Sequence, residues 1–370
     1  MHSMETNRRT LLAGLSALGL VVVLPKGALA ATDRAGFLTT ARDKLSGRFL
    51  LARVDEDLNI VWEQSLPGRA HGTNLTPDGM AVLVVGRRPG MFAVLFDVET
   101  GETIRTLVPV TGRHFYGHGV YSYDGGMLFM TENAYETGDG MIGVYDARDG
   151  YKRIGEFSSG GVGPHQLELL EDGRTLTIAN GGIRTHPDRG REKLNLDTMR
   201  SSLTLIDSES GTIMDDFSLP DADDRLLSLR HLALDGPRVV IVAQDQAKGG
   251  RHRQLTYYAD TAGGNGLTPL TTPDTAQPHF NGYCGSVATD AATSTVAVSS
   301  PRGNTVAIWR SKGTSYGWLG EIALADCCGL GGCMVTTGSG VVRKMDAAGH
   351  TVAERSYPFR QWDNHLTPIG

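Results

Sequence analysis

The sequence predicts an all-β fold, namely a seven-bladed β-propeller in which strands from the two ends of the chain complete one blade. One observation is a repeat: His71, His118 and His165 follow one another at intervals of 47 residues, which fits a four-stranded blade. A second is composition, because 48 glycines among 370 residues, with 40% hydrophobic and 21% charged content, suit a compact chain with many turns. A third is that the last segment repeats only the start of the unit.

Each unit opens with a turn that carries a histidine or a cysteine, passes an Asp-Gly or similar turn, and continues with β-rich runs. Asp-Gly pairs favour the tight turns of antiparallel hairpins, and runs of Val, Ile, Leu and Phe favour buried strands. In the three clearest units the predicted strands are 80–85, 91–98 and 102–109; 127–131, 141–146 and 151–157; 175–179, 202–207 and 212–219.

Four further units are weaker, and they open at His231, Tyr283-Cys284-Gly285, Cys328-Gly329 and Trp362–His365. The last unit stops at the C-terminus, and its missing strands are predicted at 37–42, 48–55 and 59–66. A pair of β-sandwiches would not make both ends complete one unit, and an open solenoid would need polar capping repeats. The sequence therefore assigns residues 31–370 to one closed seven-bladed propeller.

Residues 1–30 are expected to be a twin-arginine export signal and not part of the fold. Arg8 and Arg9 precede an apolar run over 11–24, and Ala28-Leu29-Ala30 offers a cleavage site between small residues. A membrane anchor is the alternative, but about 14 apolar residues are short for a span of about 20. Cleavage removes three basic residues and one acidic residue, leaving 32 basic and 40 acidic residues and a net charge of −8. We therefore expect a periplasmic protein with no membrane span after cleavage.

Charge and missing motifs exclude several function classes. The formal charge of −6 argues against nucleic acid as a partner, because a protein that binds the phosphate backbone needs a basic face. The GxSxG, HExxH and Walker motifs are absent. The four cysteines, Cys284, Cys327, Cys328 and Cys333, are too few for a disulfide scaffold, and a bridge from Cys333 to one of its neighbours stays open.

The repeat predicts a ring of histidines, because the innermost strand of each propeller blade lines the central channel. The candidate metal ligands are His71, His118, His165, His231, His365 and Cys328. Neutral imidazole suits iron, copper, zinc and nickel. A structural role, in which each histidine hydrogen-bonds within its own blade, is the alternative. Since seven strands enclose a wide channel, we expect only neighbouring blades to share an ion, with His118 and His165 as the preferred pair and His186 approaching them.

The longest irregular insertion, between Asn180 and Ser202, is of a length that is usually functional. It carries Arg184 and His186, which together with Asn180 and Arg302 are candidates for holding an anion or an anionic metal complex. A solvated loop is the alternative. Loops between second and third strands are expected on the same face, and they would bring Arg42, Arg87, Arg88, Glu132, Asn133, Asn180, Gln244, Asp245, Arg302 and Ser339 towards the channel mouth.

Several segments resemble a family of twin-arginine-exported proteins that is known only as a domain of unknown function. They are Gly163–His165, Ala179–Ile183, Thr185–Pro187, Arg191–Met199, Leu229–Leu232, Ser300–Gly303 and Trp362–His365. Genes of this family often stand beside those for imelysin-like periplasmic proteins and a haem oxidoreductase in iron-uptake clusters. The resemblance therefore implies periplasmic metal handling, with iron as the expected metal, copper as the alternative, and those proteins as partners. The family pattern has one Cys-Gly, which matches Cys328-Gly329.

The leading hypothesis is a periplasmic metal-binding protein that uses a His-lined channel mouth. One alternative is a propeller enzyme, either a redox enzyme or a lactonase- or lyase-like one, in which the same ring acts on a substrate. Another is a protein-interaction platform, which needs only the fold. The sequence does not decide whether the protein is an enzyme.

Overall fold

The structure, a computed structural model, describes residues 35–190, 192–247, 253–263, 266–313, 315–331, 334–346 and 349–370. The expected export signal over 1–30 lies outside the described residues. The described part is almost entirely β, and its helical segments are short 3-10 turns: η1 (Pro187–Arg189), η2 (Ala222–Leu226) and η3 (Gln277–Phe280). No helix within it is long and apolar enough to cross a membrane.

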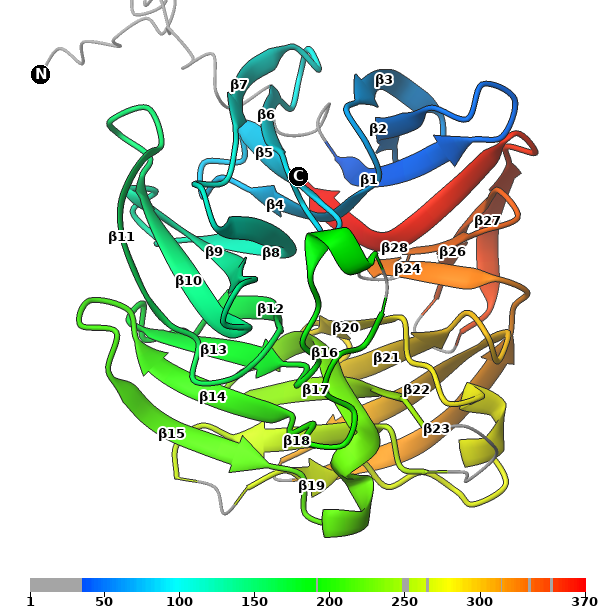
Figure 1. The fold of residues 1–370 in the computed structure, drawn as a ribbon. Helices are drawn as coiled ribbons and strands as arrows, with labels where there is room; N and C mark the ends of the chain where they lie inside the picture. Colours follow the sequence, from blue (N-terminus) through cyan, green and yellow to red (C-terminus); the bar gives the residue numbers. More distant parts are fainter. Residues whose placement is uncertain are drawn as a thin grey trace, which may run out of the picture.

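The strands follow one another in runs of four. The first strand of each run, called an inner strand below, lies nearest the centre of the molecule (Figure 1). The inner strands are β4 (Ala70–Leu75), β8 (Arg113–Tyr121), β12 (Pro164–Leu169), β16 (Leu227–Asp235), β20 (Ser286–Asp290), β24 (Cys327–Gly331) and β28 (Arg360–Ile369). The second strands are β1 (Gly36–Asp43), β5 (Ala81–Gly86), β9 (Met127–Ala134), β13 (Thr175–Asn180), β17 (Arg238–Asp245), β21 (Thr295–Ser300) and β25 (Met334–Thr337).

The remaining strands lie farther from the centre (Figure 1). The third strands are β2 (Phe49–Asp55), β6 (Ala93–Asp97), β10 (Asp139–Asp146), β14 (Ser202–Asp207), β18 (Thr256–Asp260), β22 (Thr305–Lys312) and β26 (Val341–Met345). The fourth strands are β3 (Ile60–Leu66), β7 (Thr103–Leu107), β11 (Lys152–Ser158), β15 (Ile213–Ser218), β19 (Thr268–Pro269), β23 (Ser315–Ala323) and β27 (Thr351–Ser356).

These strands of the described chain form five sheets with four strands and one sheet with eight. The eight-stranded sheet contains the runs β24-β25-β26-β27 and β28-β1-β2-β3, which are joined by one parallel pairing between Leu330 and His365. The expected all-β fold is confirmed, and four-stranded sheets arranged around a centre are consistent with a propeller. Seven separate blades are not confirmed, because β24 and β28 pair with each other and reduce the number of sheets to six.

Strand β28 joins the two ends of the chain. It pairs antiparallel with β1, so that Phe37 lies opposite Pro368 and Thr39 opposite Leu366, as the repeat predicts. The inner strands contact one another in a cycle from β4 through β8, β12, β16, β20 and β24 to β28, which contacts β4 again. The inner strands therefore surround a common axis.

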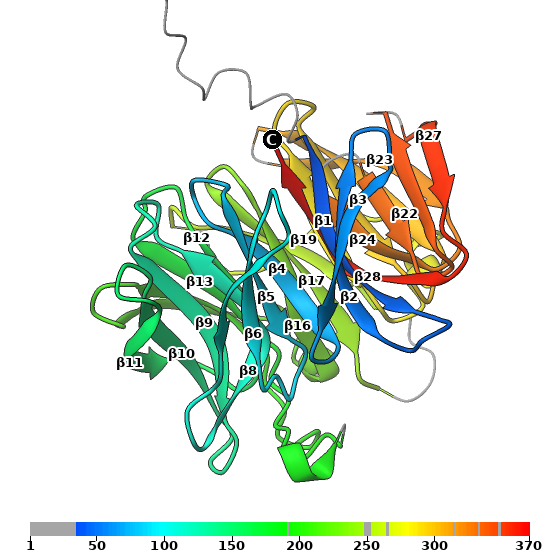
Figure 2. The ribbon, with the colours of Figure 1, turned by 90° about the horizontal axis from the view of Figure 1, so that it is seen from above.

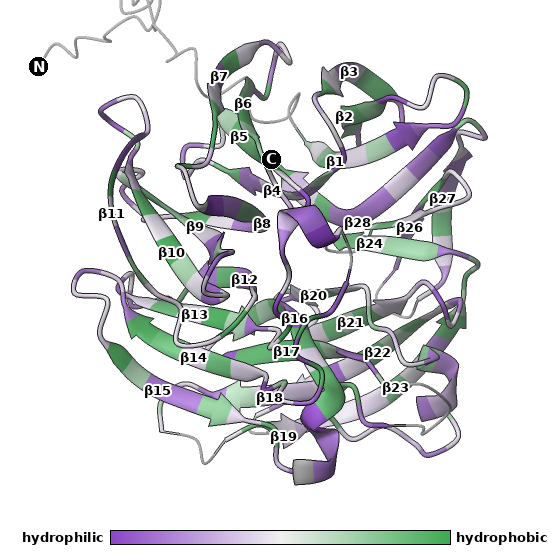
Figure 3. Ribbon diagram, viewed as in Figure 1, coloured by the Kyte–Doolittle hydropathy of each residue, from purple (hydrophilic) through white to green (hydrophobic). Residues whose placement is uncertain are grey.

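Apolar side chains fill the space between neighbouring sheets. Leu38 and Leu51 of β1 and β2, for example, pack in one cluster with Val82 and Phe96 of β5 and β6. Burial of each such side chain contributes about 1.5–3 kcal/mol. Figure 3 shows β13, β14 and β17 mostly in green, whereas β28 is largely purple where it approaches the centre. The hydrophobic core thus lies between the sheets.

The repeated turns have the conformation that their sequence predicts. Gly79, Gly125 and Gly173 follow an aspartate in equivalent turns and have φ values of +67°, +69° and +67°. This left-handed region is open to glycine at little cost. In the first turn, the Thr76 hydroxyl donates to the Asp78 carboxylate at 2.6 Å and the Met80 amide donates to it at 3.0 Å, which fixes the hairpin.

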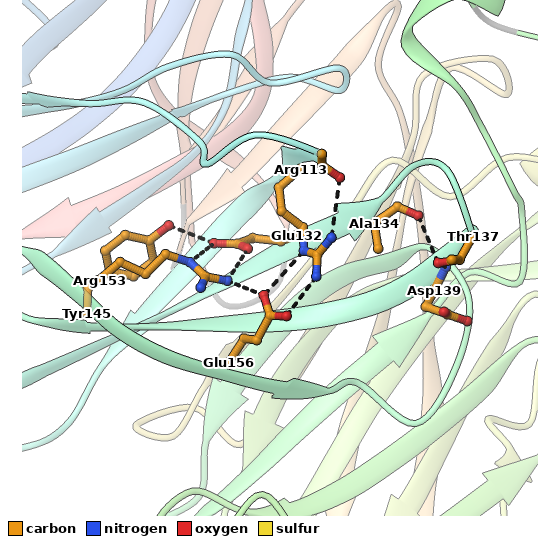
Figure 4. A network of polar contacts seen from close by, with 9 residues as sticks. Arg113, Glu132, Ala134, Thr137, Asp139, Tyr145, Arg153 and Glu156 are labelled. Atoms are coloured by element: carbon orange, nitrogen blue, oxygen red, sulfur yellow. Dashed lines mark hydrogen bonds and ion pairs between the residues drawn. The ribbon is translucent and has the colours of Figure 1, made fainter.

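A buried ionic network holds the sheet β8–β11 together (Figure 4). The carboxylate of Glu132, which is fully buried, accepts from Arg153 Nη2 at 2.8 Å and from the Tyr145 hydroxyl at 2.6 Å. Gly143 makes room for it, because a Cβ there would lie 2.0 Å from Glu132 Oε1. Arg113 extends the network through Glu156, 2.7 Å away. The network links strands β8, β9, β10 and β11.

Replacing Glu132 with alanine is expected to reduce the free energy of unfolding by about 3–5 kcal/mol, because it leaves the Arg153 guanidinium and the Tyr145 hydroxyl without their buried partner. Urea denaturation measures the change. Glu354→Ala removes a more exposed carboxylate beside Arg343 and is the control, with an expected cost below about 1 kcal/mol. Equal costs for the two variants would contradict this account of the network.

Candidate metal centre

Five histidines meet where the inner strands converge, and they are called the histidine cluster below. His71, His118, His165, His231 and His365 lie on β4, β8, β12, β16 and β28. Nine pairs among them have ring centroids between 4.6 and 5.8 Å apart. Histidines from non-adjacent strands therefore contact one another, which differs from the expectation that a wide channel would keep them apart.

Irregular strand pairing explains why the rings reach the axis. The register between each of these inner strands and its neighbour shifts at or beside the histidine, namely at Ala70/Thr73, Phe115/Gly119, Pro164/Gln166, Leu229/His231 and, between β1 and β28, Thr39/Ala41. A bulge adds unpaired residues to one strand and redirects a side chain. Here it directs each imidazole inwards, so the rings fill the centre of the channel.

Two glycines allow the rings to pack against neighbouring backbone. A Cβ on Gly117, whose φ is +117°, would lie 2.7 Å from His71 Cδ2. A Cβ on Gly72 would lie 2.5 Å from the Gly117 carbonyl oxygen and 2.9 Å from His118 Nδ1. All three separations are shorter than any ordinary contact of a Cβ atom. The contact between β4 and β8 at the cluster therefore requires glycine at both positions.

The five imidazoles are neutral at ordinary pH. Burial lowers the pKa of each ring, and neighbouring histidines lower the pKa of His71, His118, His165 and His231 further. For His365, burial lowers the pKa to about 4, although the carboxylate of Asp363 acts in the opposite direction. The neutral ring is the form that binds a metal ion.

Several ring nitrogens lack a hydrogen-bond partner although they are buried. These atoms are His71 Nδ1, His118 Nε2 and His365 Nε2. By contrast, His71 Nε2 lies 3.0 Å from His165 Nε2, and His231 Nδ1 lies 3.1 Å from the Gln166 side-chain oxygen. Buried polar atoms are nearly always paired, so these three unpaired nitrogens within one cluster are candidates for binding a metal ion.

Four histidines have the spacing that a metal site needs. One nitrogen from each of His71, His118, His231 and His365 lies within 4.8 Å of the others. Zinc–nitrogen bonds are about 2.0–2.1 Å long and zinc sites are tetrahedral, so two ligand nitrogens of such a site lie about 3.4 Å apart. Nitrogens up to 4.8 Å apart reach this spacing when each ring moves inwards by less than about 1 Å. The four donors therefore fit a transition-metal ion.

The histidine cluster separates two cavities on the axis. The first, called the basic cavity below, has a volume of about 510 Å³ and includes His71, His165 and His231 in its wall. The second has a volume of about 390 Å³ and includes His118, His231 and His365. In the second cavity, burial raises the pKa of Glu168 to about 7, while a hydrogen bond from Gln166 opposes the shift. An ion in the cluster would be reachable from both sides.

The basic cavity is named for its cationic lining. The cations are Arg69, Arg87, Arg88, Lys193, Arg230 and Arg302. Arg69 meets a carboxylate, since its Nε and Nη2 donate to Asp363 at 2.8 and 2.9 Å. Burial, together with the charge of Arg88, lowers the pKa of Arg230 to about 9. The insertion between Asn180 and Ser202 crosses in front of the channel centre as a green loop in Figure 1 and projects from one face in Figure 2.

The structure places the other predicted site residues in different surroundings. Arg302 lines the basic cavity, with its guanidinium 4.7 Å from the centre of the Tyr283 ring. Arg184 donates to the Glu136 carbonyl oxygen at 2.7 Å, and His186 packs edge-on against Tyr135. Neither of these two side chains is among the residues that line the two cavities.

Asn180 and Cys328 also lie apart from the cluster's four candidate donors. Asn180 is fully buried and bonds to Thr204 within its own sheet and to Ser159, which follows β11 of the preceding sheet. The Cys328 thiol donates to the Asp326 carbonyl oxygen, and burial raises its pKa to about 12. Cys284, Cys327 and Cys328 are free thiols, and Cys333 lies outside the described residues.

Of the loop residues expected at the channel mouth, Arg87, Arg88, Gln244 and Arg302 line the basic cavity. The remaining six are not among its lining residues; they are Arg42, Glu132, Asn133, Asn180, Asp245 and Ser339. Sequence reasoning missed Arg69, Lys193 and Arg230. Arg230 directly precedes His231 and Arg69 precedes His71 by two residues, so proximity to a repeated histidine is the signal that was available.

Comparison with protein families identifies the chain's relatives. The family model described as "Protein of unknown function (DUF1513)" matches residues 64–369. The chain belongs to this family. The match confirms the resemblance to a domain of unknown function, and the DUF1513 region contains all five histidines of the cluster. No curated protein matches the sequence.

Solved structures resemble the DUF1513 fold at low sequence identity. Hydrazine synthase of Kuenenia stuttgartiensis matches with a TM-score of 0.55 and 17% identity, over 78% of this chain and 80% of that one. A functionally unknown protein from Desulfotomaculum acetoxidans DSM 771 matches with a TM-score of 0.62 and 11% identity, over 90% and 99% of the two chains. At these identities the likeness concerns the fold alone.

Proposed function

We propose that the protein binds a transition-metal ion in the histidine cluster and takes part in periplasmic metal handling. One observation carries the proposal: four neutral histidines offer nitrogens within 4.8 Å of one another, and His71, His118 and His365 each have a buried nitrogen with no partner. A purely structural role for the histidines would predict hydrogen bonds that satisfy these atoms.

Iron is the proposed metal, and copper is the second choice. Imidazole nitrogen suits both, together with zinc and nickel, so the donor set alone does not select among them. The preference for iron rests on the family resemblance and its association with iron-uptake genes. For the same reason, imelysin-like proteins or a haem oxidoreductase are the proposed partners. The twin-arginine pattern over 1–30 supports the periplasm as the proposed location.

We also propose that the fold is a propeller of seven blades. The single pairing of Leu330 with His365 joins two runs that otherwise have the strand order of separate four-stranded sheets. When β24-β25-β26-β27 and β28-β1-β2-β3 are counted as separate blades, each of the seven inner strands belongs to one blade. Five of these inner strands supply a histidine to the cluster.

A redox enzyme is the second candidate function. It is favoured by the basic cavity, because His71, His165 and His231 line it and a substrate there would lie beside an ion in the cluster. Catalytic turnover of a substrate distinguishes the two candidate functions. A redox enzyme would convert a second molecule, whereas a binding protein would hold and release the ion without changing one.

Metal loading tests the proposal. Protein exported in its native host is expected to contain metal, or to take up Fe²⁺ in anaerobic reconstitution, with elemental analysis and anomalous scattering at the metal edges as the measurements. The double variant His118→Ala/His365→Ala is expected to bind roughly 100-fold more weakly or worse, because changes even to residues behind the ligands cost about 10–100-fold. His350→Ala, whose side chain is 79% exposed, is the control. A folded wild type that takes up no metal would refute the proposal.

A further inference from the structure

We propose that the basic cavity is a binding site for a small organic polyanion that carries two or more carboxylate or phosphate groups. The inference concerns the cavity above the histidine cluster and does not require an ion in the cluster.

The charge of the cavity wall is the first observation. Its six cationic side chains come from the segments before β4 and after β5, from β16, from the segment after β21 and from the insertion after β13, and they are Arg69, Arg87, Arg88, Arg230, Arg302 and Lys193. None of the described residues that line the cavity is an aspartate or a glutamate. Asp363 lies behind the wall and pairs with Arg69. The cavity therefore carries a large excess of positive charge.

Arg230 is the second observation. Its side chain belongs to a residue that is 4% exposed, and its Nε has no hydrogen-bond partner. Its Nη1 lies 3.3 Å from His165 Nδ1, which is a neutral group. A buried guanidinium without a carboxylate is costly, since its desolvation is not repaid by a counter-charge. A ligand that supplies the counter-charge explains why this arginine is held at the bottom of the cavity.

The contacts that hold Arg88 and Arg302 in the cavity wall are the third observation. Arg88 donates to the Tyr116 hydroxyl at 3.2 Å, and Arg302 lies over the Tyr283 ring. Neither tyrosine neutralises the guanidinium that it contacts. Both arginine side chains are therefore held in place with their positive charge available to a ligand. Planar guanidinium groups bind carboxylates and phosphates with two parallel hydrogen bonds.

The volume of the basic cavity and the positions of its cations together indicate the class of ligand. A volume of about 510 Å³ falls within the range of ordinary small-molecule sites and exceeds the needs of a single inorganic ion. The cations come from separate segments around the mouth, so a ligand with several spaced anionic groups meets more of them than a single phosphate does. Cationic molecules are disfavoured by the charge of the wall.

Isothermal titration of metal-free, chelator-treated full-length protein with citrate and with pyrophosphate tests the inference at low ionic strength. Binding of either is expected to be much tighter than that of acetate and to weaken with added salt, because the attraction is partly screened. Tighter binding of citrate assigns the site to carboxylates, and tighter binding of pyrophosphate assigns it to phosphates. Because the protein carries no metal in this experiment, failure of metal loading would not affect the result.

Variants locate the site. Lys193→Gln and Arg302→Gln lie on loops, and each is expected to weaken binding about tenfold, the loss of one charge-assisted hydrogen bond. Arg230→Gln is expected to have the largest effect, provided that its circular dichroism and thermal transition show a folded protein. Arg148→Gln, which removes a 66% exposed arginine beside Asp124, is the control and is expected to leave binding unchanged. Citrate and pyrophosphate that bind no better than acetate, or loop variants that match the control, would overturn the inference.

Discussion

Deletion of Asp363–Gly370 is expected to abolish the cooperative native state. These residues form most of β28, which pairs with β1 along its length and contacts β24 and β4. The deletion removes the buried Leu366 and Ile369, each worth about 1.5–3 kcal/mol, and exposes the edge of β1. The loss of strand pairing adds to this, and the total is comparable with the 5–15 kcal/mol that stabilises an ordinary domain, as an order of magnitude.

Thermal unfolding followed by circular dichroism measures the effect of the deletion. Val352→Ser on β27, where the side chain is 59% exposed, is the control and is expected to change stability by less than about 0.5 kcal/mol. Adding a synthetic peptide of residues 360–370 to the truncated protein is expected to restore part of the transition, because the peptide can pair with β1. A truncated protein that melts within a few degrees of the full-length chain would show that ring closure does not control stability.

Lowering the pH from 7 to 5 is expected to destabilise the metal-free protein by several kcal/mol. Burial, above all, holds the pKa of His71, His118, His165, His231 and His365 below 6.5 in the folded state. Below about pH 6.5 the unfolded chain therefore binds more protons than the native state, and the free energy of unfolding falls. Each ring that stays neutral accounts for about 2 kcal/mol between pH 7 and 5. For His365 the loss is complete once the pH has passed through about 4.

Glu168 acts in the opposite direction. Its pKa is raised to about 7 in the folded state, so the native protein keeps a proton that the unfolded chain releases down to about pH 4.5. Between pH 7 and 5 this carboxyl offsets roughly one histidine. The expected net decrease in the free energy of unfolding between pH 7 and 5 remains comparable with the whole stability of an ordinary domain.

Urea denaturation at pH 7, 6 and 5 in the presence of a chelator measures this pH dependence. His365→Gln is expected to reduce the steepness of the dependence by about one proton, since one buried group no longer titrates on unfolding. His350→Gln, on the exposed side chain, serves as the control and is expected to leave the steepness unchanged. The same stability at pH 7 and 5 for the wild type would mean that the cluster accepts protons in the folded state.

Much of the fold was predictable from local sequence. Asp78-Gly79 and its equivalents specify a turn through the conformational freedom of glycine, and the apolar runs between turns specify buried strands. The repeat interval then placed His71, His118 and His165 at equivalent positions, and the incomplete last unit placed the C-terminal segment beside the N-terminal strand, which the pairing of β28 with β1 confirms. The count of separate sheets was not predictable, because it depends on one pairing between Leu330 and His365, residues of two different units.

The sequence by itself determined that five of the inner strands carry a histidine, since periodicity in the chain becomes periodicity around an axis. The expectation that each histidine starts its strand was wrong for His118, His231 and His365, which lie in the middle of β8, β16 and β28. Only the tertiary structure decided what those residues do. The five imidazoles stand at bulges in the pairing of their own strands, and they meet because inner strands distant in the chain converge on the axis. A bulge in β24 leaves Cys328 bonded to its own loop. Long-range packing likewise gathers Arg230 and Lys193, 37 residues apart, into one cavity and leaves Arg184 outside it. The physical reason is that local sequence fixes turns and strand propensity, whereas side-chain direction depends on register and on partners distant in the chain.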